Sequence, residues 1–389
     1  AMTNTIGCIE KADVILITGS NTTENHPVLS NFVKRAVTFK KTKLIVVDPR
    51  RIKISTFADQ WLRPNLGTDV VWINGLMHVI IEEELFDKDF VTNRTEKFDE
   101  LKDIVKKFTP EFVEEICGIP AQSLIDAARL YAGEKTGSIL YCMGITQHTT
   151  GTDNVKSLAN LAMLCGNLGM EGGGVNPLRG QNNVQGACDM GGLPNVFSGY
   201  QAVTDSELRK KMEDAWGVTD LPEKAGLTAT KMIPSAYDGN LKAMYIIGEN
   251  PLVSDPDLNH TEKSLLNLDF LVVQDIFLSE TAVIADVVLP SACFAEKDGT
   301  FTNTERRVQR VRKAVDSVGD ARQDWQIIAD IADVLGYEMS YSSVSEIMDE
   351  IAQVTPSYGG MSYNRIDKIG LQWPCPDKNH PGTPILHAG

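Results

Sequence analysis

Short apolar runs alternate with amphipathic stretches along the first half of the chain. The runs 13–19 and 43–48 each end in polar residues, which is typical of buried strands in a parallel sheet. The segment between them, Val28 to Phe39, is predicted to be a helix, since Pro27 suits a first helical turn. Strand, helix and strand together predict a right-handed βαβ unit.

The same alternation of apolar runs and amphipathic stretches continues to about residue 165. A helix is expected from about Val70 to Glu84, because residues 67–69 (Gly-Thr-Asp) can cap it. A charged helical stretch over about 97–133 precedes a third strand at 137–143 and a helix over about 153–165. These elements extend the first βαβ unit into a larger sheet.

The second half of the chain repeats this pattern. Strands are predicted at 241–248, 270–275 and 285–290, and a helix at about 324–335 that Gly336 ends. The runs VILITGSN and LIVVDPR are echoed by MYIIGENP and LVVQDIF. We therefore expect an α/β fold with two Rossmann-like parallel-sheet domains. Their polar residues would lie at the carboxyl ends of the strands, where ligands bind in open parallel sheets.

A glycine-rich stretch, residues 166–199, separates the two halves. So long a stretch without low complexity more often lines a site than forms a flexible linker. We place the domain boundary inside it, which predicts a first domain over 1–181 and a second over 182–389.

Composition and charge narrow the class of protein. The chain has 389 residues, a formal net charge of −15 and a pI near 4.9, which argues against nonspecific nucleic-acid binding. No apolar run approaches the roughly 18 to 20 residues of a membrane span, so a cytoplasmic protein is expected. The seven cysteines contain no CxxC pair, hence no zinc or iron–sulfur signature.

Motifs for common nucleotide enzymes are missing from the sequence. Neither a G-x-G-x-x-G nor a P-loop follows any predicted strand, which disfavours an NAD-binding dehydrogenase. Asp48, at a strand end, could bind a nucleoside hydroxyl, but it could equally form the turn before Pro49. Asp275, after Gln274, has the same two interpretations.

A few polar side chains invite a functional hypothesis. Arg179, between Leu178 and Gly180, could offer its planar guanidinium to a small carboxylate, or could form a structural ion pair that fixes the loop. His26 and His148 have no partner at metal-ligand spacing, which is more typical of hydrogen-bonded residues near turns. The basic cluster over 306–313 suggests a solvated strand or a contact to pyrophosphate or a partner subunit.

Several longer segments carry a family resemblance in family order, from about residue 2 to residue 376. They include TENHPV, VVDPRR, MGITQH, YIIGENPLVSDPD and DWQIIADIA, and the run RGQNNVQGACDMG is long and specific. Together they resemble the molybdopterin oxidoreductase superfamily, and within it the catalytic subunits of formate dehydrogenases. The resemblance implies two pterin guanine dinucleotides that chelate one Mo or W, one dinucleotide per α/β domain, about a pseudo-two-fold axis.

The resemblance also assigns cofactor-binding residues in each half. In the first half these would be Asn21, Asp48, Arg50, Gly67, Thr68 and Asp69, with Met143, Gly144 and Gln147 beside a pterin. In the second half they would be Gly248, Glu249, Asn250, Gln274 and Asp275, with Glu296, Gly299 and Asn303 close by. Polar strand ends, glycine turns and amides suit guanine edges and pyrophosphate oxygens.

For catalysis, the resemblance implies that Arg179 holds the carboxylate of formate and that Gln181 supports it. The implied reaction interconverts formate and CO2 in a two-electron step, with an iron–sulfur electron-transfer subunit as partner. No protein ligand to the metal is found in this sequence. The resemblance places that ligand, a [4Fe–4S] domain and a C-terminal β-barrel domain outside these 389 residues, so the isolated chain is expected to be inactive.

Two other interpretations of the function remain open. A non-catalytic scaffold or electron-transfer subunit of the same superfamily would keep the α/β domains without the metal site. Another bis-pterin oxidoreductase, such as a nitrate reductase, would share the cofactor but act on a different substrate.

Overall fold

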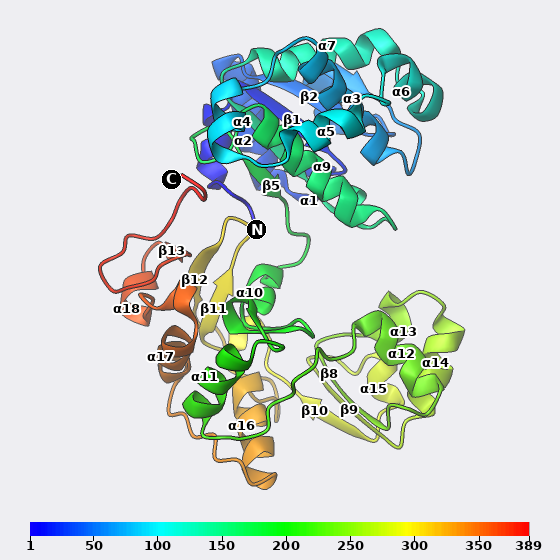
Figure 1. The fold of residues 1–389 in the computed structure, drawn as a ribbon. Coiled ribbons are helices and arrows are strands. Elements are labelled where there is room, and N and C mark those ends of the chain that lie inside the picture. The colour runs from blue at the N-terminus through cyan, green and yellow to red at the C-terminus, as the bar shows by residue number, and fades with distance from the viewer. Residues whose placement is uncertain (389) are drawn as a thin grey trace. The chain divides into compact units, whose positions relative to one another are not determined.

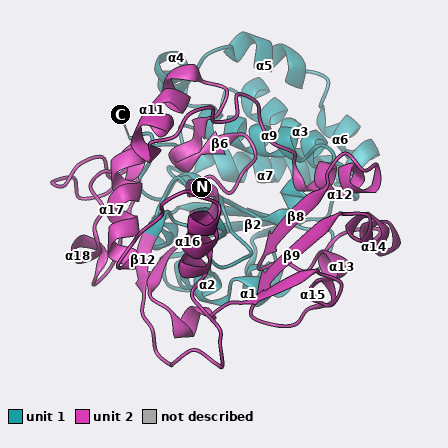
Figure 2. Ribbon diagram, turned by 90° about the horizontal axis from the view of Figure 1, so that it is seen from below, with its two compact units in different colours: residues 1–185, 303–307, 383–389 teal, residues 186–302, 308–382 magenta. Residues whose placement is uncertain are grey.

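A computed structural model describes residues 1–388 and divides them into two compact units (Figures 1 and 2). Unit 1 consists of residues 1–185, 303–307 and 383–388, and unit 2 consists of residues 186–302 and 308–382. The first segment of unit 1 thus ends close to the boundary that the glycine-rich stretch suggested. The predicted division does not include the return of residues 303–307 and of the C-terminal residues to unit 1. Such short segments have no apolar core of their own, so no pattern in the sequence indicates their position.

Unit 1 contains a five-stranded, all-parallel sheet in the order β3-β2-β1-β4-β5. The strands are β1 (Val14–Thr18), β2 (Lys43–Val47), β3 (Gln60–Leu62), β4 (Gly137–Tyr141) and β5 (Val175–Pro177). The helices are η1 (Ile6–Lys11), α1 (Thr22–Asn25), α2 (Pro27–Lys40), η2 (Lys53–Phe57), α3 (Asp69–Glu82), α4 (Lys88–Arg94), α5 (Phe98–Val105), α6 (Pro110–Cys117), α7 (Ala121–Gly133), α8 (Met143–Thr146) and α9 (Gly151–Leu164). Every residue of β1 and β4 is buried.

Helices cover both faces of this sheet, because successive side chains of a strand point to opposite faces. Val14 and Leu16 of β1 pack in one apolar cluster with α3, α7 and α9. Ile15 and Ile17 pack in a second cluster with η1 and α2. Figure 2 shows β2 between α7 and α9 on one side and α2 on the other. Burial on both faces is the usual environment of a parallel sheet.

Unit 2 is built around two small three-stranded sheets. One is a parallel sheet with the strand order β10-β9-β8. The other has the order β11-β12-β13, and its strands β11 and β12 are antiparallel. The strands of the unit are β6 (Val196–Phe197), β7 (Gln201–Ala202), β8 (Ala243–Ile247), β9 (Phe270–Asp275), β10 (Val287–Pro290), β11 (Gly299–Thr302), β12 (Arg307–Val311) and β13 (Leu371–Gln372). The first residue of β12, Arg307, belongs to unit 1.

The remaining helices lie in this part of the chain, and α10 begins just before it. They are α10 (Val184–Asp189), η3 (Ser198–Tyr200), α11 (Ser206–Trp216), α12 (Ala229–Tyr237), α13 (Pro251–Ser254), α14 (Leu258–Leu266), α15 (Glu280–Val283), η4 (Phe294–Glu296), α16 (Asp324–Val334), α17 (Val344–Val354), η5 (Pro356–Tyr358) and α18 (Tyr363–Ile366). Within residues 1–388, no helix combines the length and the apolar composition that a membrane span requires.

The predicted fold class is confirmed: the protein is α/β, with one parallel sheet in each unit. The predicted strands at 13–19, 43–48, 137–143, 241–248, 270–275 and 285–290 correspond to β1, β2, β4, β8, β9 and β10. The predicted helices at 28–39, 70–84, 153–165 and 324–335 correspond to α2, α3, α9 and α16. In unit 1, the two three-residue strands β3 and β5 were not predicted, since three residues are too few for a periodic pattern. In unit 2, β6, β7, β11 and β13 were not predicted either.

Candidate functional site

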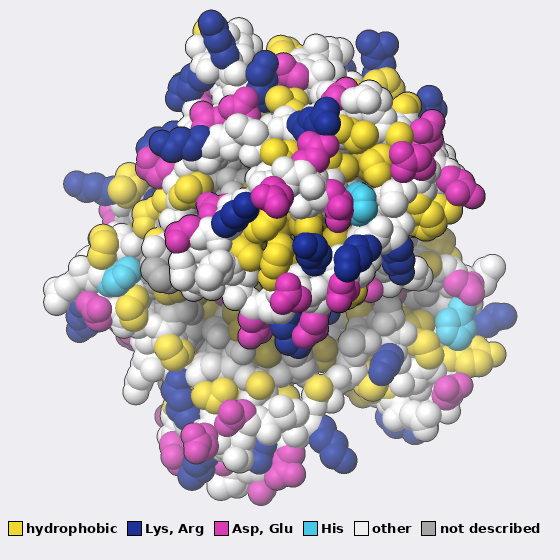
Figure 3. Space-filling view, turned by 45° about the horizontal axis from the view of Figure 1, so that its top comes forward, with side chains coloured by type: hydrophobic (Ala, Val, Ile, Leu, Met, Phe, Trp, Pro, Cys, Tyr) yellow, Lys and Arg dark blue, Asp and Glu magenta, His cyan; other side chains and the backbone are white. Residues whose placement is uncertain are grey.

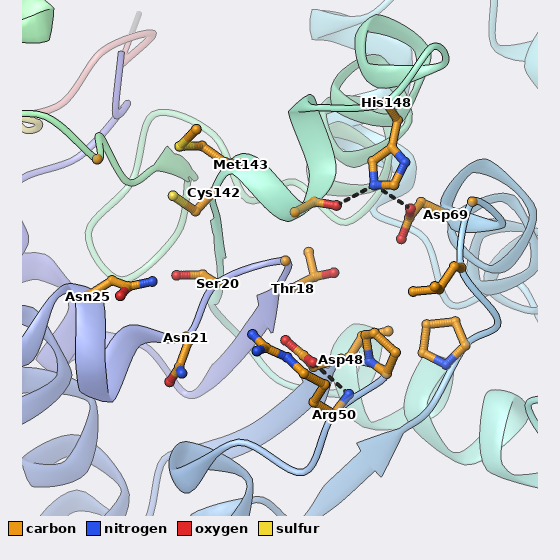
Figure 4. Close-up of a pocket in the computed structure, with 18 of the residues that line it drawn as sticks. Thr18, Ser20, Asn21, Asn25, Asp48, Arg50, Asp69, Cys142, Met143 and His148 are labelled. Carbon is orange, nitrogen blue, oxygen red and sulfur yellow. Dashed lines mark hydrogen bonds and ion pairs between the residues drawn. The ribbon is translucent and has the colours of Figure 1, made fainter. Parts of the chain in front are cut away.

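A cavity of about 610 Å³ opens at the carboxyl end of the unit 1 sheet (Figure 4). We call it the strand-end cavity. Its lining comes from the segments that follow all five strands: 18–26 after β1, 47–50 after β2, 64–69 after β3, 142–148 after β4, and Gly180 and Gln181 after β5. A cavity at this position is the usual ligand site of an open parallel sheet.

Two glycines bring the loops after β1 and β4 into direct contact. Gly19 has φ +57°, and a Cβ atom there would lie 2.6 Å from the Ile145 nitrogen. A Cβ on Gly144 would lie 2.6 Å from the Gly19 Cα atom, and the Gly144 N–H donates to the Gly19 carbonyl at 3.0 Å. Only two residues without side chains allow this approach, so the glycines fix one end of the cavity.

The loop after β1 carries buried polar atoms that lack a partner among the described residues. Three of these atoms, Ser20 Oγ, Asn21 Oδ1 and His26 Nδ1, belong to residues that line the strand-end cavity, and the fourth, Thr22 Oγ1, does not. Ser20 is only 4% exposed. A buried polar atom without a hydrogen bond costs about 1–3 kcal/mol, so several in one loop indicate a site that is completed by a polar ligand.

Two carboxylates face the cavity from different strand ends, and burial raises the pKa of each. Asp48 accepts a hydrogen bond from the Arg50 backbone N–H at 2.8 Å, but burial dominates and raises its pKa from the ordinary value of 3.8. Burial likewise raises the pKa of Asp69, although Trp72 Nε1 donates to it at 3.2 Å and His148 Nε2 lies 3.9 Å away. Figure 4 shows Asp48 with Arg50 on one side of the cavity and Asp69 with His148 on another. Such carboxylates favour a ligand that donates hydrogen bonds.

Most residues assigned to the first dinucleotide lie together. Of the assigned residues, those that line the strand-end cavity are Asn21, Asp48, Arg50, Gly67, Asp69, Met143, Gly144 and Gln181. Thr68 and Gln147 are not part of the lining. Thr68 Oγ1 donates to the Asn65 carbonyl at 2.7 Å, and the Gln147 N–H donates to the Met143 carbonyl at 2.9 Å.

Arg179 lies directly beside this lining and forms no ion pair among the described residues. Its Nε donates to Gln185 Oε1 at 3.1 Å. Neither Nη atom has a hydrogen-bond partner within residues 1–388, so this end of the guanidinium remains able to bind a carboxylate through two N–H groups. The structural ion pair that was the alternative for Arg179 is not formed with any residue in 1–388.

The two histidines are hydrogen-bonded residues near turns, as the sequence indicated. His26 Nε2 lies 2.8 Å from the Arg179 carbonyl, and His148 Nε2 lies 2.9 Å from the Gly144 carbonyl. Among the described residues, no group of three or more His, Cys, Asp or Glu side chains is arranged to hold a metal ion.

The strand ends of unit 2 form a smaller cavity of about 290 Å³, which Gly248 and Asp275 line. Gln274 is fully buried, and its Nε2 donates to Asp324 Oδ1 at 2.7 Å. Asn250 Oδ1 accepts from the Thr281 hydroxyl at 2.8 Å, while Nδ2 donates to Glu280 at 2.6 Å. This asparagine is therefore satisfied within unit 2.

The remaining assigned residues of the second half lie elsewhere. Glu249 is exposed, and partial burial, followed by repulsion from Asp255, raises the pKa of its carboxyl. Glu296 accepts from the Cys293 N–H at 2.8 Å, and Gly299 begins β11. Asn303 lies in the short segment that belongs to unit 1, where its Oδ1 accepts from the Glu305 and Arg307 N–H groups.

Several lining residues were not selected from the sequence. Ser20, Asn25 and His26 are the polar ones from the loop after β1, and Asn65 comes from the loop after β3. Position after a strand end would have pointed to the first three. Asn65 could not be found in this way, because β3 itself gave no signal.

Comparison with known proteins places these features in a family. The family model "Molybdopterin oxidoreductase" matches residues 1–334. Over its full length, the chain is 56% identical to the F420-dependent formate dehydrogenase subunit alpha of Methanocaldococcus jannaschii, of which it covers 57%. It is 44% identical over 378 residues to formate dehydrogenase H of Escherichia coli, covering 97% of the chain and 53% of that protein. The chain therefore spans little more than half the length of these relatives.

Among solved structures, acetylene hydratase from Pelobacter acetylenicus has a similar fold. The TM-score is 0.74 at 24% sequence identity, over 96% of this chain and 53% of that one. This similarity supports the fold.

The chain belongs to the molybdopterin oxidoreductase family. Membership implies a molybdopterin cofactor with molybdenum or tungsten. The residues present fit a group of this kind, since the strand-end cavity offers unpartnered acceptors and hydroxyls at Ser20, Asn21 and His26 and buried carboxylates at Asp48 and Asp69. A pterin cofactor carries the ring N–H groups and hydroxyls that such atoms bind.

Proposed function

We propose that this chain is part of a formate dehydrogenase that interconverts formate and CO2 in a two-electron reaction. The observation that carries the proposal is the state of Arg179. Its Nε is bound to Gln185 and its two Nη atoms have no partner among the described residues. The names of the relatives, formate dehydrogenases at 44–56% identity, support the same substrate.

In this proposal Arg179 binds formate through both carboxylate oxygens. A planar guanidinium matches a carboxylate bidentately, and it stays charged at any working pH, so formate is held as an ion in one orientation. Gln181, which lines the strand-end cavity two residues later, supports this position. Correct orientation of a small substrate contributes strongly to rate, because misplacement by about 1 Å can cost 100-fold.

The cofactor would be a pair of molybdopterin guanine dinucleotides. The strand-end cavity would hold one, through Asn21, Asp48, Arg50, Gly67 and Asp69, with Met143 and Gly144 beside the pterin. The strand ends of unit 2, with Gly248 and Asp275, would contribute to the other. When bound, the metal centre accepts the two electrons of formate oxidation, while the protein orients the substrate.

The complete enzyme would contain more than this chain. A [4Fe–4S] cluster and the metal-ligating residue would lie in the additional length that the relatives have, and an iron–sulfur subunit would carry the electrons onward. The isolated 389-residue chain should therefore show no formate-dependent dye reduction. A cytoplasmic location belongs to the same proposal, supported by the acidic composition.

The test uses the complete enzyme, a polypeptide of the relatives' length that contains this segment. Arg179→Ala should lower kcat/KM for formate by about 100-fold or more, because the substrate loses its charged anchor. Arg51→Ala is the matched control, since Arg51 is exposed and lies over Trp61 outside the cavity lining. An unchanged kcat/KM in Arg179→Ala would refute the formate site, and an inactive wild-type enzyme would favour the scaffold.

The nucleotide part of the proposal can be tested on the chain itself. Guanosine diphosphate should bind the strand-end cavity, and Arg50→Ala should weaken binding about tenfold or more, as expected for one charge-assisted hydrogen bond. Arg51→Ala should leave the affinity unchanged. Equal effects of the two substitutions in calorimetry would contradict binding at this cavity.

A further inference from the structure

The main chain of Arg179 is held from two sides by residues that are remote in sequence. Its backbone N–H donates to Thr304 Oγ1 at 3.1 Å, and its carbonyl lies 2.8 Å from His26 Nε2. Thr304 and His26 lie 125 and 153 residues away along the chain. Since Gly180 follows, whose missing side chain leaves the backbone unusually free, these two hydrogen bonds are what fixes the peptide unit on either side of the arginine.

Thr304 is itself firmly anchored. Its hydroxyl donates to the Pro177 carbonyl at 2.8 Å, which leaves a lone pair to accept the Arg179 N–H. The neighbouring Glu305 accepts from the Ile6 N–H at 2.7 Å. Arg306 is fully buried and donates to the carbonyls of Met2 and Thr383, each at 2.8 Å. The segment 303–307 is therefore a rigid insertion into unit 1, with Thr304 at the arginine.

The chemistry of the His26 contact fixes its tautomer. A carbonyl oxygen only accepts, so Nε2 must carry the proton and donate to Arg179. In the neutral ring Nδ1 is then the acceptor nitrogen, and it is buried without a partner among the described residues. His26 lies at the junction of α1 and α2, where Pro27 begins the second helix, so its backbone is fixed as well.

We propose that His26 and Thr304 are positioning residues that hold the main chain of Arg179 so that its guanidinium faces a small carboxylate. The identity of that carboxylate as formate rests on the function proposed above, whereas the positioning itself does not. The side chain of an arginine has several rotatable bonds, so its tip is placed well only when its backbone is fixed and its Nε is tied, here by Gln185.

The first test measures the order of the Arg179 side chain directly in the 389-residue chain. Nitrogen-15 NMR measures solvent exchange of the Arg179 Nε–H, a signal that is assigned by its loss in Arg179→Lys. His26→Leu and Thr304→Val remove the two hydrogen bonds and should each accelerate this exchange about tenfold, the effect of one lost hydrogen bond. His26→Gln and Thr304→Ser keep a donor and an acceptor at these places and should restore slow exchange.

His78→Leu is the matched control. His78 Nδ1 also lies near a main-chain carbonyl of unit 1, that of Val105 at 3.1 Å, but His78 is not part of the cavity lining. This variant should lose a similar amount of stability and leave the Arg179 signal unchanged. Two independent sites, 26 and 304, keep the test decisive if one leucine or valine variant fails to fold.

The second test measures formate turnover in the complete enzyme. His26→Leu should lower kcat/KM about tenfold while His26→Gln recovers it. Unchanged Arg179 exchange in both His26→Leu and Thr304→Val would overturn the positioning role, even if Arg179→Ala abolished turnover. Faster exchange together with turnover that is indifferent to Arg179→Ala would uphold the positioning role and refute the formate site instead.

Discussion

The parallel sheets of units 1 and 2 begin with similar sequences and acquire different surroundings. In both, the first three strands have the order third, second, first: β3-β2-β1 in unit 1 and β10-β9-β8 in unit 2. In both, a glycine with positive φ follows the first strand, Gly19 at +57° and Gly248 at +65°. Local sequence thus produces the same strand, turn and connection twice.

The difference lies in what covers the strands. All five residues of β1 are buried, whereas Tyr245 and Ile247 of β8 are 39% and 46% exposed. These two side chains share one face with Phe270 and Val287, which are also exposed. The apolar core of this sheet lies on the opposite face, where Ile246 packs in a cluster with residues of α12, α14 and α15. The comparison teaches that an apolar run predicts a strand but not the number of its faces that are covered.

The loops after the first strand of each sheet, β1 and β8, also differ in their contacts. Asn21 in unit 1 has an Oδ1 atom without a partner among the described residues, whereas Asn250 in unit 2 uses its Oδ1 on Thr281. Gly19 touches Gly144, whereas a Cβ on Gly248 would meet nothing within 4 Å. Unit 1 therefore presents a tightly built site, and the corresponding turn of unit 2 is open.

The largest contrast is expected from truncating one isoleucine in each sheet. Ile17→Ala removes a fully buried side chain and should lower the free energy of unfolding by about 2–5 kcal/mol. Ile247→Ala removes a half-exposed one and should cost less than about 1 kcal/mol. Urea unfolding, followed by hydrogen exchange in β1 and β8, measures both. Equal losses would show that the open face of β8 is covered in solution.

A smaller contrast is expected at the two glycine turns. Gly248→Ala should cost about 1–2 kcal/mol, the penalty for a side chain at positive φ. Gly19→Ala adds a clash with the Gly144–Ile145 backbone, so its total should reach about 2–4 kcal/mol. Guanosine diphosphate binding at the strand-end cavity should also fall in Gly19→Ala and not in Gly248→Ala, because Gly248 lies outside that cavity. Similar melting temperatures for the two variants would contradict the close contact of the loops after β1 and β4.

The smallest effect concerns pH. Burial raises the pKa of Asp48 in the folded protein above its ordinary 3.8, so the folded state binds the proton more tightly than the unfolded state does. The contribution of Asp48 to stability is therefore fully present below 3.8 and is lost as pH rises through the folded-state pKa. The stability of Asp48→Asn relative to wild type should accordingly be greater at pH 7 than at pH 3.

Glu249→Gln in unit 2 provides the comparison for this pH effect. Its carboxyl pKa is also raised, but the residue is exposed, so solvent screening should make the change between pH 3 and pH 7 smaller. Thermal unfolding of both variants and wild type at the two pH values gives the difference. A change of opposite sign for Asp48→Asn would mean that the carboxylate is already paired in the folded protein.

The order of the main elements was accessible from the sequence. Strands β1, β2 and β4 are uninterrupted apolar runs, and α2 and α3 begin at Pro27 and Asp69, so local periodicity and capping were sufficient. The positions of Asp48 and Gly144 after strand ends placed them in the strand-end cavity, since the carboxyl ends of parallel strands meet at one edge. The motif that contains Arg179 was also visible.

Only the tertiary structure decided how that arginine is held. Thr304 reaches its N–H from a segment that local sequence assigned to the second half, and His26 reaches its carbonyl from the other end of unit 1. Likewise, the burial of β1 and the exposure of β8 follow from which helices pack on each sheet. Hydrogen bonds and packing between residues more than a hundred positions apart leave no periodic trace, because chain folding and not local preference brings them together.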